Sequence, residues 1–290
     1  MNASGALLEP GVSAPVWRAG PPLEQPGSEG EGSMALREEL EGQGKWLFRW
    51  RSYLPLLLIP VLFLALRHSG GLERVGGPVA AGVFKGFCVA ISFAGLAIRG
   101  ITVGYIPTGI SNRNTARLEA VDVRTTGAYS IVRHPLYFGN FLIFLGVTLS
   151  IQVWWFVLIA ALAFWLYYER IMLAEEGFLR SKFGEAYSEW AARTPAFFPR
   201  VKSWRRPVTP FSFRNVLRRE YTGFFEIIAA FALLEFAGSW LAEGRPRFSL
   251  AWGILLAIAF VTYLTLRTLK KTTRLLEAGR PAASVSDGKE

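Results

Sequence analysis

"PLYFGNFLIFLGVTLSIQVWWFVLIAALAFWLYY", residues 135–168, is an apolar run without a single charged side chain. As one helix it would be about 50 Å long at 1.5 Å per residue, whereas the hydrocarbon core of a bilayer is about 30 Å thick. The run therefore predicts two membrane helices, Leu136–Ile151 and Val153–Tyr168, joined by a tight turn near Ser150–Gln152.

Apolar segments of similar length lie on both sides of this run, and each predicts a membrane helix: Trp46–Leu66, Pro78–Ile98, Tyr221–Leu241 and Phe248–Leu266. Hydrophobic residues make up 51% of the 290 residues and charged residues only 19%, which excludes a single soluble domain. We therefore predict an all-α, polytopic membrane protein with six transmembrane helices plus an interfacial amphipathic helix.

Lysine and arginine are concentrated on alternate loops of this predicted bundle. Because positively charged loops stay on the cytoplasmic side, this pattern predicts that both termini are cytoplasmic. The formal net charge of +10 thus follows the membrane topology, and we predict no nucleic-acid partner. The chain has one cysteine, Cys88, and two histidines, so neither an intrachain disulfide nor a His/Cys metal site is predicted.

The order of polar and apolar segments divides the chain into four parts. Residues 1–44 are predicted to be a disordered tail, because they begin with a stretch rich in Gly, Pro and Glu that lacks an apolar core. Residues 45–200 form the predicted membrane core, 201–275 an additional two-helix hairpin, and 276–290 a second disordered tail. The more ordinary sequence from Met34 onward favours a translation start there, which mass spectrometry of the native N-terminus tests.

Lys85, Glu226 and Glu235 fall inside predicted membrane helices. Lys85 and Glu235 lie about 10 Å and about 9 Å from the outer ends of their helices. This similar depth predicts an ion pair that links the additional hairpin to the core. Glu226 lies nearer the cytoplasmic end, and we expect its side chain to extend toward the head groups. None of the three is assigned a catalytic role.

"TTGAYSIVRHPLYFGN", residues 125–140, places a polar cluster at the start of the third predicted helix. Its proline suits a first helical turn, where the missing N–H would be unpaired in any case. His134 and Tyr137 share a helix face, and Gly139 lets a backbone or a ligand approach closely. The free N–H groups of the first turn attract negative charge. Alternatively, Arg133 reaches lipid phosphates and His134 caps the helix.

"YYERIMLAEEGFLRSKFGEAYSEWAARTPAFFPR", residues 167–200, follows the fourth predicted helix on the same side of the membrane. An amino-acid-like ligand needs an anion for its ammonium, which Glu175 or Glu176 would supply. It needs a cation for its carboxylate, which Arg170 or Arg133 would supply. Further along, apolar residues at helical spacing predict an amphipathic helix in the interface plane, with a stripe that serves packing or membrane contact. The stripe consists of Phe178, Leu179, Phe183, Tyr187 and Trp190.

Together, "GAYSIVRHPLYFG" and "R…EEGFL…FGEAYSEW…TPAFFP" resemble the isoprenylcysteine carboxyl methyltransferase and phospholipid methyltransferase family of integral membrane enzymes. The resemblance covers residues 99–200. It implies a methyltransferase core in residues 45–200 that binds S-adenosyl-L-methionine between helices at the cytoplasmic side. The implied acceptor is a lipid or a prenylated small molecule, with either an isoprenylcysteine-like carboxylate or a phospholipid-like amine.

Carried over by position, the resemblance implies a donor site made of His134, Tyr137, Gly127, Tyr129, Gly139, Glu175, Glu176 and Arg170. The implied catalytic residues are Arg170, His134 and Arg133. Arg170 is the sensitive basic residue beside the acidic pair, and His134 is placed to take a proton from an amine acceptor. Arg133 or Arg170 would orient an anionic head group. The family's C-terminal edge of the pocket matches Pro195 and Pro199.

The sequence leaves several alternatives open. Sterol and steroid reductases share a related "RHPxYxG" pattern with a nicotinamide cofactor, so a membrane NADPH-dependent reductase is a second interpretation, although the Glu–Glu pair favours the methyltransferase. A third is a non-enzymatic membrane protein, such as an assembly factor or a transporter, although the chain has no convincing internal repeat. The resemblance ends near Pro199 and assigns no purpose to the last two helices. The acceptor and the oligomeric state also stay open.

Overall fold

The computed structural model describes residues 36–50, 54–106, 125–246 and 248–273, and the regular elements in these ranges are helical. The helices are α1 Leu36–Trp50, α2 Ile59–Leu66, α3 Gly71–Gly104, α4 Pro135–Leu149, α5 Trp154–Arg193, α6 Phe213–Glu243 and α7 Leu250–Thr272. Short 3₁₀ turns are η1 Leu54–Leu58, η2 Gly127–Ser130 and η3 Val201–Ser203. The predicted tail at 276–290, most of the predicted N-terminal tail and Met34 lie outside the described residues.

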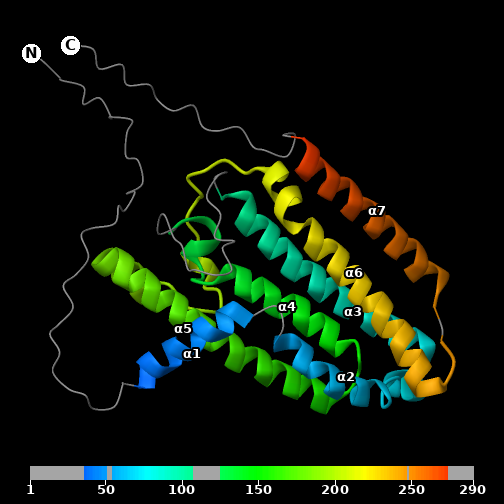
Figure 1. Cartoon of the computed structure of the whole chain (residues 1–290). Coiled ribbons are helices and arrows are strands. Elements are labelled where there is room, and N and C mark those ends of the chain that lie inside the picture. The colour runs from blue at the N-terminus through cyan, green and yellow to red at the C-terminus, as the bar shows by residue number, and fades with distance from the viewer. Residues whose placement is uncertain (1–35, 51–53, 107–124, 247, 274–290) are drawn as a thin grey trace, which may run out of the picture.

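Among the residues that the structure describes, four helices are long and apolar enough to cross a membrane: α3, α5, α7 and Phe213–Leu241 of α6. Two shorter apolar helices accompany them, Leu56–Leu66 and Pro135–Leu149. The chain is therefore an all-α polytopic membrane protein, as the sequence predicts. Figure 1 shows α3 and α6 running side by side through the bundle, with α7 packed on α6 at its outer side.

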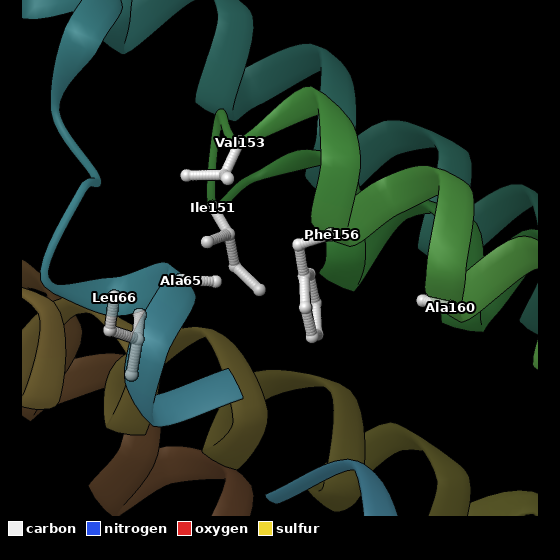
Figure 2. Close-up of a cluster of buried hydrophobic side chains, with 6 residues drawn as sticks. All are labelled: Ala65, Leu66, Ile151, Val153, Phe156 and Ala160. Atoms are coloured by element: carbon white, nitrogen blue, oxygen red, sulfur yellow. The ribbon is translucent and has the colours of Figure 1, made fainter. Parts of the chain in front are cut away.

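The predicted turn between the third and fourth apolar segments is confirmed. α4 ends at Leu149 and α5 begins at Trp154, and Gln152 between them has a positive φ of 63°. The turn packs against α2 in a buried cluster, shown in Figure 2, of Ala65, Leu66, Ile151, Val153, Phe156 and Ala160. The reversal sends α5 back along α4, so that Tyr168 comes within hydrogen-bond distance of Asn140.

The prediction of one membrane helix over Trp46–Leu66 is wrong. α1 ends at Trp50 and α2 begins at Ile59, directly after the 3₁₀ turn η1. Two prolines explain the break, because Pro55 and Pro60 cannot donate the backbone hydrogen bonds that a continuous helix needs.

α1 begins at Leu36, before the predicted N-terminal tail ends at residue 44, and packs across α5. Its Gly44 lies so close to the backbone carbonyl of Arg170 that any side chain there would clash. α1 therefore covers α5 at the point where the apolar part of that helix gives way to polar residues.

Small residues bring α3 and α4 close together. Gly95 lies against the backbone of Gly139, and Gly146 lies against Ser92, so neither contact has room for a larger side chain. The Ser92 hydroxyl donates a hydrogen bond of 3.0 Å to the Ile143 carbonyl. Such close packing is a main source of helix association where lipid surrounds the helices, because the lipid chains are as apolar as the side chains.

The predicted ion pair between α3 and α6 is confirmed, with Lys85 Nζ at 2.6 Å from Glu235 Oε2. Glu235 also accepts a hydrogen bond of 3.4 Å from the backbone N–H of Ser249, just before α7. Lys85 lies 5.9 Å from the centre of the Trp252 ring. This pair therefore ties α3, α6 and α7 together.

The predicted interfacial helix is the second part of α5, which continues to Arg193 instead of ending near Tyr168 (Figure 1). Gly184 interrupts α5 with φ 56° and ψ −132°, a conformation that favours glycine because a Cβ atom would strain it. Tyr187 and Trp190 beyond this break are buried together with Phe183, which confirms the packing role of the stripe.

Candidate functional site

The segment before α4 is held by the loop that follows α5. The Arg133 N–H donates to the Pro195 carbonyl at 2.8 Å, and the His134 N–H donates to the Ala196 carbonyl at 3.2 Å. A further backbone hydrogen bond of 2.9 Å runs from the N–H of residue 200 to the carbonyl of residue 131. Two stretches that are far apart in the sequence thus fix each other's backbone, and this fixes the direction of the Arg133 and His134 side chains.

Arg133, His134 and Glu176 form a buried cluster. Glu176 Oε2 lies 2.7 Å from an Arg133 terminal nitrogen, and Glu176 Oε1 lies 2.9 Å from His134 Nε2. Only 6% of His134 and 9% of Glu176 are exposed, so their interaction is screened less than a surface pair would be. Glu175 Oε2 is 3.7 Å from His134 Nδ1. The structure therefore brings the Arg-His-Pro segment and the acidic pair to one place.

Aromatic rings connect this cluster to the interior of the bundle. The His134 ring stacks on Tyr137, with 5.5 Å between centroids, as their shared helix face requires. The Tyr137 ring lies 5.1 Å from that of Tyr168 on α5. The Tyr168 hydroxyl accepts a hydrogen bond of 3.3 Å from Asn140.

Four buried polar atoms of this region have no hydrogen-bond partner in the part of the chain that the structure describes: Arg133 Nε, Arg180 Nε, Tyr187 Oη and Trp190 Nε1. Arg180 and Tyr187 both interact electrostatically with Glu176, and the Tyr187 and Trp190 ring centres are 5.5 Å apart. All four atoms can donate a hydrogen bond. A buried donor without an acceptor costs about 1–3 kcal/mol. The arrangement therefore suits a ligand that brings several acceptor atoms.

The sequence prediction does not include Arg180, Tyr187 and Trp190 among the site residues. For Arg180 the signal is its spacing from Glu176, because it follows the acid by four residues and so lies on the same helix face. Tyr187 lies beyond the break at Gly184, so helical spacing does not place it relative to Glu176. Tyr187 and Trp190 of the apolar stripe can pack through their rings and still offer a hydroxyl and an indole N–H to a ligand.

Gly127 and Tyr129 lie in η2, next to the same aromatic residues. Gly127 has a φ of 63°, and its N–H donates to the Arg205 carbonyl at 3.0 Å. The Ser130 hydroxyl donates to the Gly127 carbonyl at 2.7 Å and accepts from the Arg205 N–H at 2.9 Å. Tyr129 packs against the buried aromatic group of α5. η2 therefore connects the cluster to the segment that leads into α6.

Two of the predicted site residues lie outside the cluster. Gly139 faces the α3 backbone, so the close approach that it allows is between two helices. Arg170 donates to the Gln43 side chain of α1 at 3.1 Å and to the Leu166 carbonyl at 2.9 Å. It does not join the acidic pair, because five or six residues along an α-helix turn a side chain to a different face.

A cavity of about 770 Å³ lies between α4, α5 and α6, with Tyr168, Arg170, Arg99 and Asn140 among its lining residues. This volume falls within the range of small-molecule pockets in proteins, about 300–1,000 Å³. Tyr168 contacts Tyr137, which stacks on His134, so the rings of Tyr168 and Tyr137 lie between the cavity and the Glu176 cluster.

Residues 79–186 match the sequence model of the phospholipid methyltransferase family. The matched segment contains α4, most of α3 and the part of α5 up to residue 186. It therefore includes Arg133, His134 and both acids of the pair. It stops before Tyr187, Trp190 and the whole of α6.

Several curated proteins are similar to parts of the chain. It is 44% identical over 81 residues, 28% of this chain and 37% of the relative, to the cobalt-zinc-cadmium resistance protein CzcN of Cupriavidus metallidurans. It is 35% identical over 118 residues, 38% of this chain and 54% of the relative, to the nickel-cobalt-cadmium resistance protein NccN of Alcaligenes xylosoxydans xylosoxydans. It is 31% identical over 91 residues, 31% of this chain and 37% of the relative, to the protein-S-isoprenylcysteine O-methyltransferase of Schizosaccharomyces pombe.

The chain thus spans between 37% and 54% of the length of these relatives. No solved structure matches the chain. Through residues 79–186, the chain is similar to the phospholipid methyltransferase family, and through 91 residues it is similar to an isoprenylcysteine O-methyltransferase.

Proposed function

We propose that this chain is an integral membrane methyltransferase that transfers the methyl group of S-adenosyl-L-methionine to a lipid or lipid-linked acceptor. The observation that carries the proposal is the buried cluster of Arg133, His134 and Glu176, surrounded by donor atoms that lack acceptors. The family match over residues 79–186 supports the same class of reaction. The similarity to an isoprenylcysteine O-methyltransferase supports it as well.

The residues of the site suit S-adenosyl-L-methionine. Its carboxylate needs hydrogen-bond donors, and the Nε atoms of Arg133 and Arg180 lack acceptors. Its ammonium needs a carboxylate, and Glu175 is the freer of the two acids because its ionic contact is 3.7 Å long. Tyr187 and Trp190 provide two further donors and an aromatic surface for the adenosine part.

Glu176 acts as a positioning residue in this proposal. One of its oxygens binds Arg133 and the other binds His134, so it holds these side chains in place rather than a ligand. Of the alternatives that the sequence leaves open, the geometry therefore favours Glu175 for the ammonium of the donor. For the carboxylate it favours Arg133 over Arg170.

The contact with Glu176 also holds the His134 ring in place. The ionised Glu176 carboxylate can only accept a hydrogen bond, so His134 Nε2 donates to it, and the ring is held with Nδ1 directed toward Glu175 at 3.7 Å. Its ring supports Tyr137 by stacking. We therefore assign His134 to orienting the donor site. An acceptor that is already an anion needs no base for methyl transfer.

When bound, S-adenosyl-L-methionine supplies a methyl group on a sulfonium, which is already activated for in-line displacement. The protein then contributes mainly by holding the two reactants in contact, and proximity and orientation account for large rate factors in such reactions. The cavity beside Tyr168 offers an apolar volume for the chain of a lipid acceptor. The basic loops favour a site on the cytoplasmic side, with both termini on that side as well.

The function is tested by incubating the purified full-length chain with methyl-labelled S-adenosyl-L-methionine and total lipid and protein extracts, and by identifying the labelled product. We expect incorporation that is lost in Glu175→Gln and Arg133→Gln. It should persist in Glu185→Gln, which changes an exposed acid on the same helix. If the wild-type chain transfers no label and instead binds NADPH, the reductase alternative replaces this proposal.

A further inference from the structure

The linker that joins α5 to α6, residues 194–212, is held against the end of α3 and against η2. The Ser212 N–H donates a hydrogen bond of 2.8 Å to the Gly104 carbonyl at the end of α3. Both backbone groups of Arg205 are hydrogen-bonded to η2. In Figure 1 the linker crosses the end of the bundle where α3 ends and α6 begins. Its side chains therefore extend from a fixed backbone.

The linker and the first turn of α6 are basic. Between Glu189 and Glu220 the chain has several Lys and Arg residues but no Asp or Glu. The bases whose side chains are exposed here are Arg200, Lys202, Arg205, Arg206 and Arg214. None of these side chains forms an ion pair with another residue that the structure describes. Positive charge is therefore concentrated on one short exposed segment.

Large apolar side chains are exposed among these bases. Phe198, Trp204 and Phe213 have exposed fractions of 68%, 45% and 64%. The exposed apolar residues of the segment are Phe198, Val201, Trp204, Val208, Phe211 and Phe213. All but Phe213 lie outside the helices that are long enough to cross a membrane, so the lipid chains around those helices do not account for them. An exposed apolar series of this kind marks an interaction surface.

A membrane interface satisfies both kinds of side chain. The tryptophan ring is amphipathic and is favoured at the level of the head groups. Lysine and arginine extend their charged ends toward lipid phosphates while their stems cover apolar surface. The segment leads directly into α6, which is long and apolar enough to cross the membrane, and clusters of bases in this position bind anionic lipids. A nucleic acid or an acidic protein would meet the charges but leave the apolar series exposed.

We propose that residues 198–214 form a surface that binds the head groups of anionic phospholipids. Arg205 and Arg206 contact the lipid phosphates, and the Trp204 ring inserts between neighbouring head groups. The proposal does not depend on the proposed methyl transfer, because an anionic lipid such as phosphatidylglycerol has neither an amine nor a carboxylate to methylate. Since the Arg205 backbone is bonded to η2, a bound lipid also holds η2 and the adjoining Glu176 cluster at the level of the head groups.

The experiment uses the full-length protein in phosphatidylcholine nanodiscs that contain a small fraction of a photoactivatable lipid. The probe is phosphatidylglycerol with a diazirine beside its head group, and the control is phosphatidylcholine with the same diazirine. Mass spectrometry after irradiation maps the labelled residues. We expect phosphatidylglycerol to label residues 198–214 at least about tenfold more than phosphatidylcholine, and high salt to reduce this preference. Equal labelling by the two lipids, or a preference confined to other basic segments, overturns the proposal.

Two pairs of adjacent bases separate this surface from the general positive charge of the cytoplasmic side. Arg205→Gln with Arg206→Gln removes two side chains but keeps the backbone bonds to η2, and it should lower the preference for phosphatidylglycerol about tenfold. Lys270→Gln with Lys271→Gln removes the same charge at the end of α7, next to the start of α6, and should leave the preference at residues 198–214 unchanged. Equal losses in the two double variants overturn the proposal.

A further pair of variants tests the apolar part of the surface. Trp204→Ser should weaken labelling of residues 198–214 by both lipids, because insertion of the ring does not depend on the charge of the head group. Trp154→Ser, at the other end of α5, should leave this labelling unchanged. Unchanged labelling in Trp204→Ser overturns the insertion of its ring. Binding of a fluorescent RNA by the wild type, without a preference for phosphatidylglycerol, would assign the surface to nucleic acid and overturn the lipid proposal.

Discussion

Glu176 organises the candidate site through its two oxygens, because each of them binds a side chain from the segment before α4. A buried carboxylate of this kind is stable only while its partners remain, and loss of one partner leaves an uncompensated charge. Around Glu176, by contrast, there are more buried donors than acceptors, since Arg133 Nε and Tyr187 Oη are buried without acceptors. In the proposed function, a bound ligand would supply the acceptors that these atoms lack.

This imbalance gives a prediction for Tyr187→Phe. The Tyr187 hydroxyl is buried beside Arg133 and makes no hydrogen bond of normal geometry, so its removal should change the thermal stability of the free protein little. Affinity for S-adenosyl-L-methionine should fall, by about 1 kcal/mol for one lost hydrogen bond. Thermal unfolding with and without the donor measures both effects. A loss of stability without a loss of affinity would show that the hydroxyl has a purely structural role.

A second prediction compares two arginines. Arg133 binds Glu176, whereas Arg170 binds Gln43 of α1 and lies outside the cluster. Arg133→Gln should therefore weaken donor binding by at least about tenfold, and Arg170→Gln should leave it nearly unchanged. Equilibrium dialysis with labelled donor measures this. The reverse result would restore the assignment of Arg170 that the family resemblance implies.

At the scale of elements, α5 has two tasks. Its first part crosses the apolar layer, and its second part carries the acids and the aromatic residues of the site. Gly184 divides the polar part and sets the direction of Tyr187 and Trp190 relative to Glu176. The backbone at this glycine is thus part of the site, although its Cα has open space around it.

Gly184→Ala should therefore reduce donor affinity, since φ 56° with ψ −132° is unfavourable for a residue with a Cβ atom. We expect a cost of about 1–3 kcal/mol, divided between stability and affinity. Gly86→Ala is the matched control, because that glycine also has open space around it but has ordinary helical geometry. Equal affinities of the two variants would mean that the break in α5 does not position the site.

Length and composition predicted the turn at Ser150–Gln152, because no single helix of that length fits the bilayer. They did not predict the break between α1 and α2. Hydropathy does not register the effect of Pro55 and Pro60, and the contact of Gly44 with α5 is tertiary. Local periodicity likewise predicted the helix after the fourth span but not its continuity with that span.

The candidate site could be predicted from motifs as far as Arg133, His134 and the acidic pair. Nearness in sequence did not predict which arginine binds the acidic pair. Arg170 is close in sequence but points to a different face of the helix, whereas Arg133 comes from a distant segment and binds Glu176 through a tertiary contact. That Arg180 Nε and Tyr187 Oη are buried donors without acceptors can be known only from the structure, which gives their burial and their hydrogen-bond partners.

At the scale of the whole molecule, two ion pairs between described residues join the additional helices to the core. Arg99 with Glu220 and Lys85 with Glu235 both connect α3 to α6, and Arg99 also lines the cavity. A change to the Arg99–Glu220 pair should therefore alter the cavity as well as the packing of α3 on α6, whereas a change to the Lys85–Glu235 pair should alter only the packing.

Reversal of the Lys85–Glu235 pair tests this arrangement. Lys85→Glu and Glu235→Lys should each lower the free energy of unfolding by about 2 kcal/mol, because each places like charges together on membrane helices. The double variant should recover most of the loss in a thermal unfolding assay. Donor affinity should be the same in the stable double variant and in wild type. Additive losses without recovery would show that the two side chains do not interact.

The central claim is that two polar segments, remote in sequence, form one site for S-adenosyl-L-methionine. Isothermal titration of this donor into the full-length protein in nanodiscs, for wild type, Glu176→Gln and Glu185→Gln, tests the claim most directly. We predict saturable binding by wild type and Glu185→Gln, and at least about tenfold weaker binding by Glu176→Gln. The absence of donor binding in wild type, or equal affinity in all three proteins, would contradict the claim.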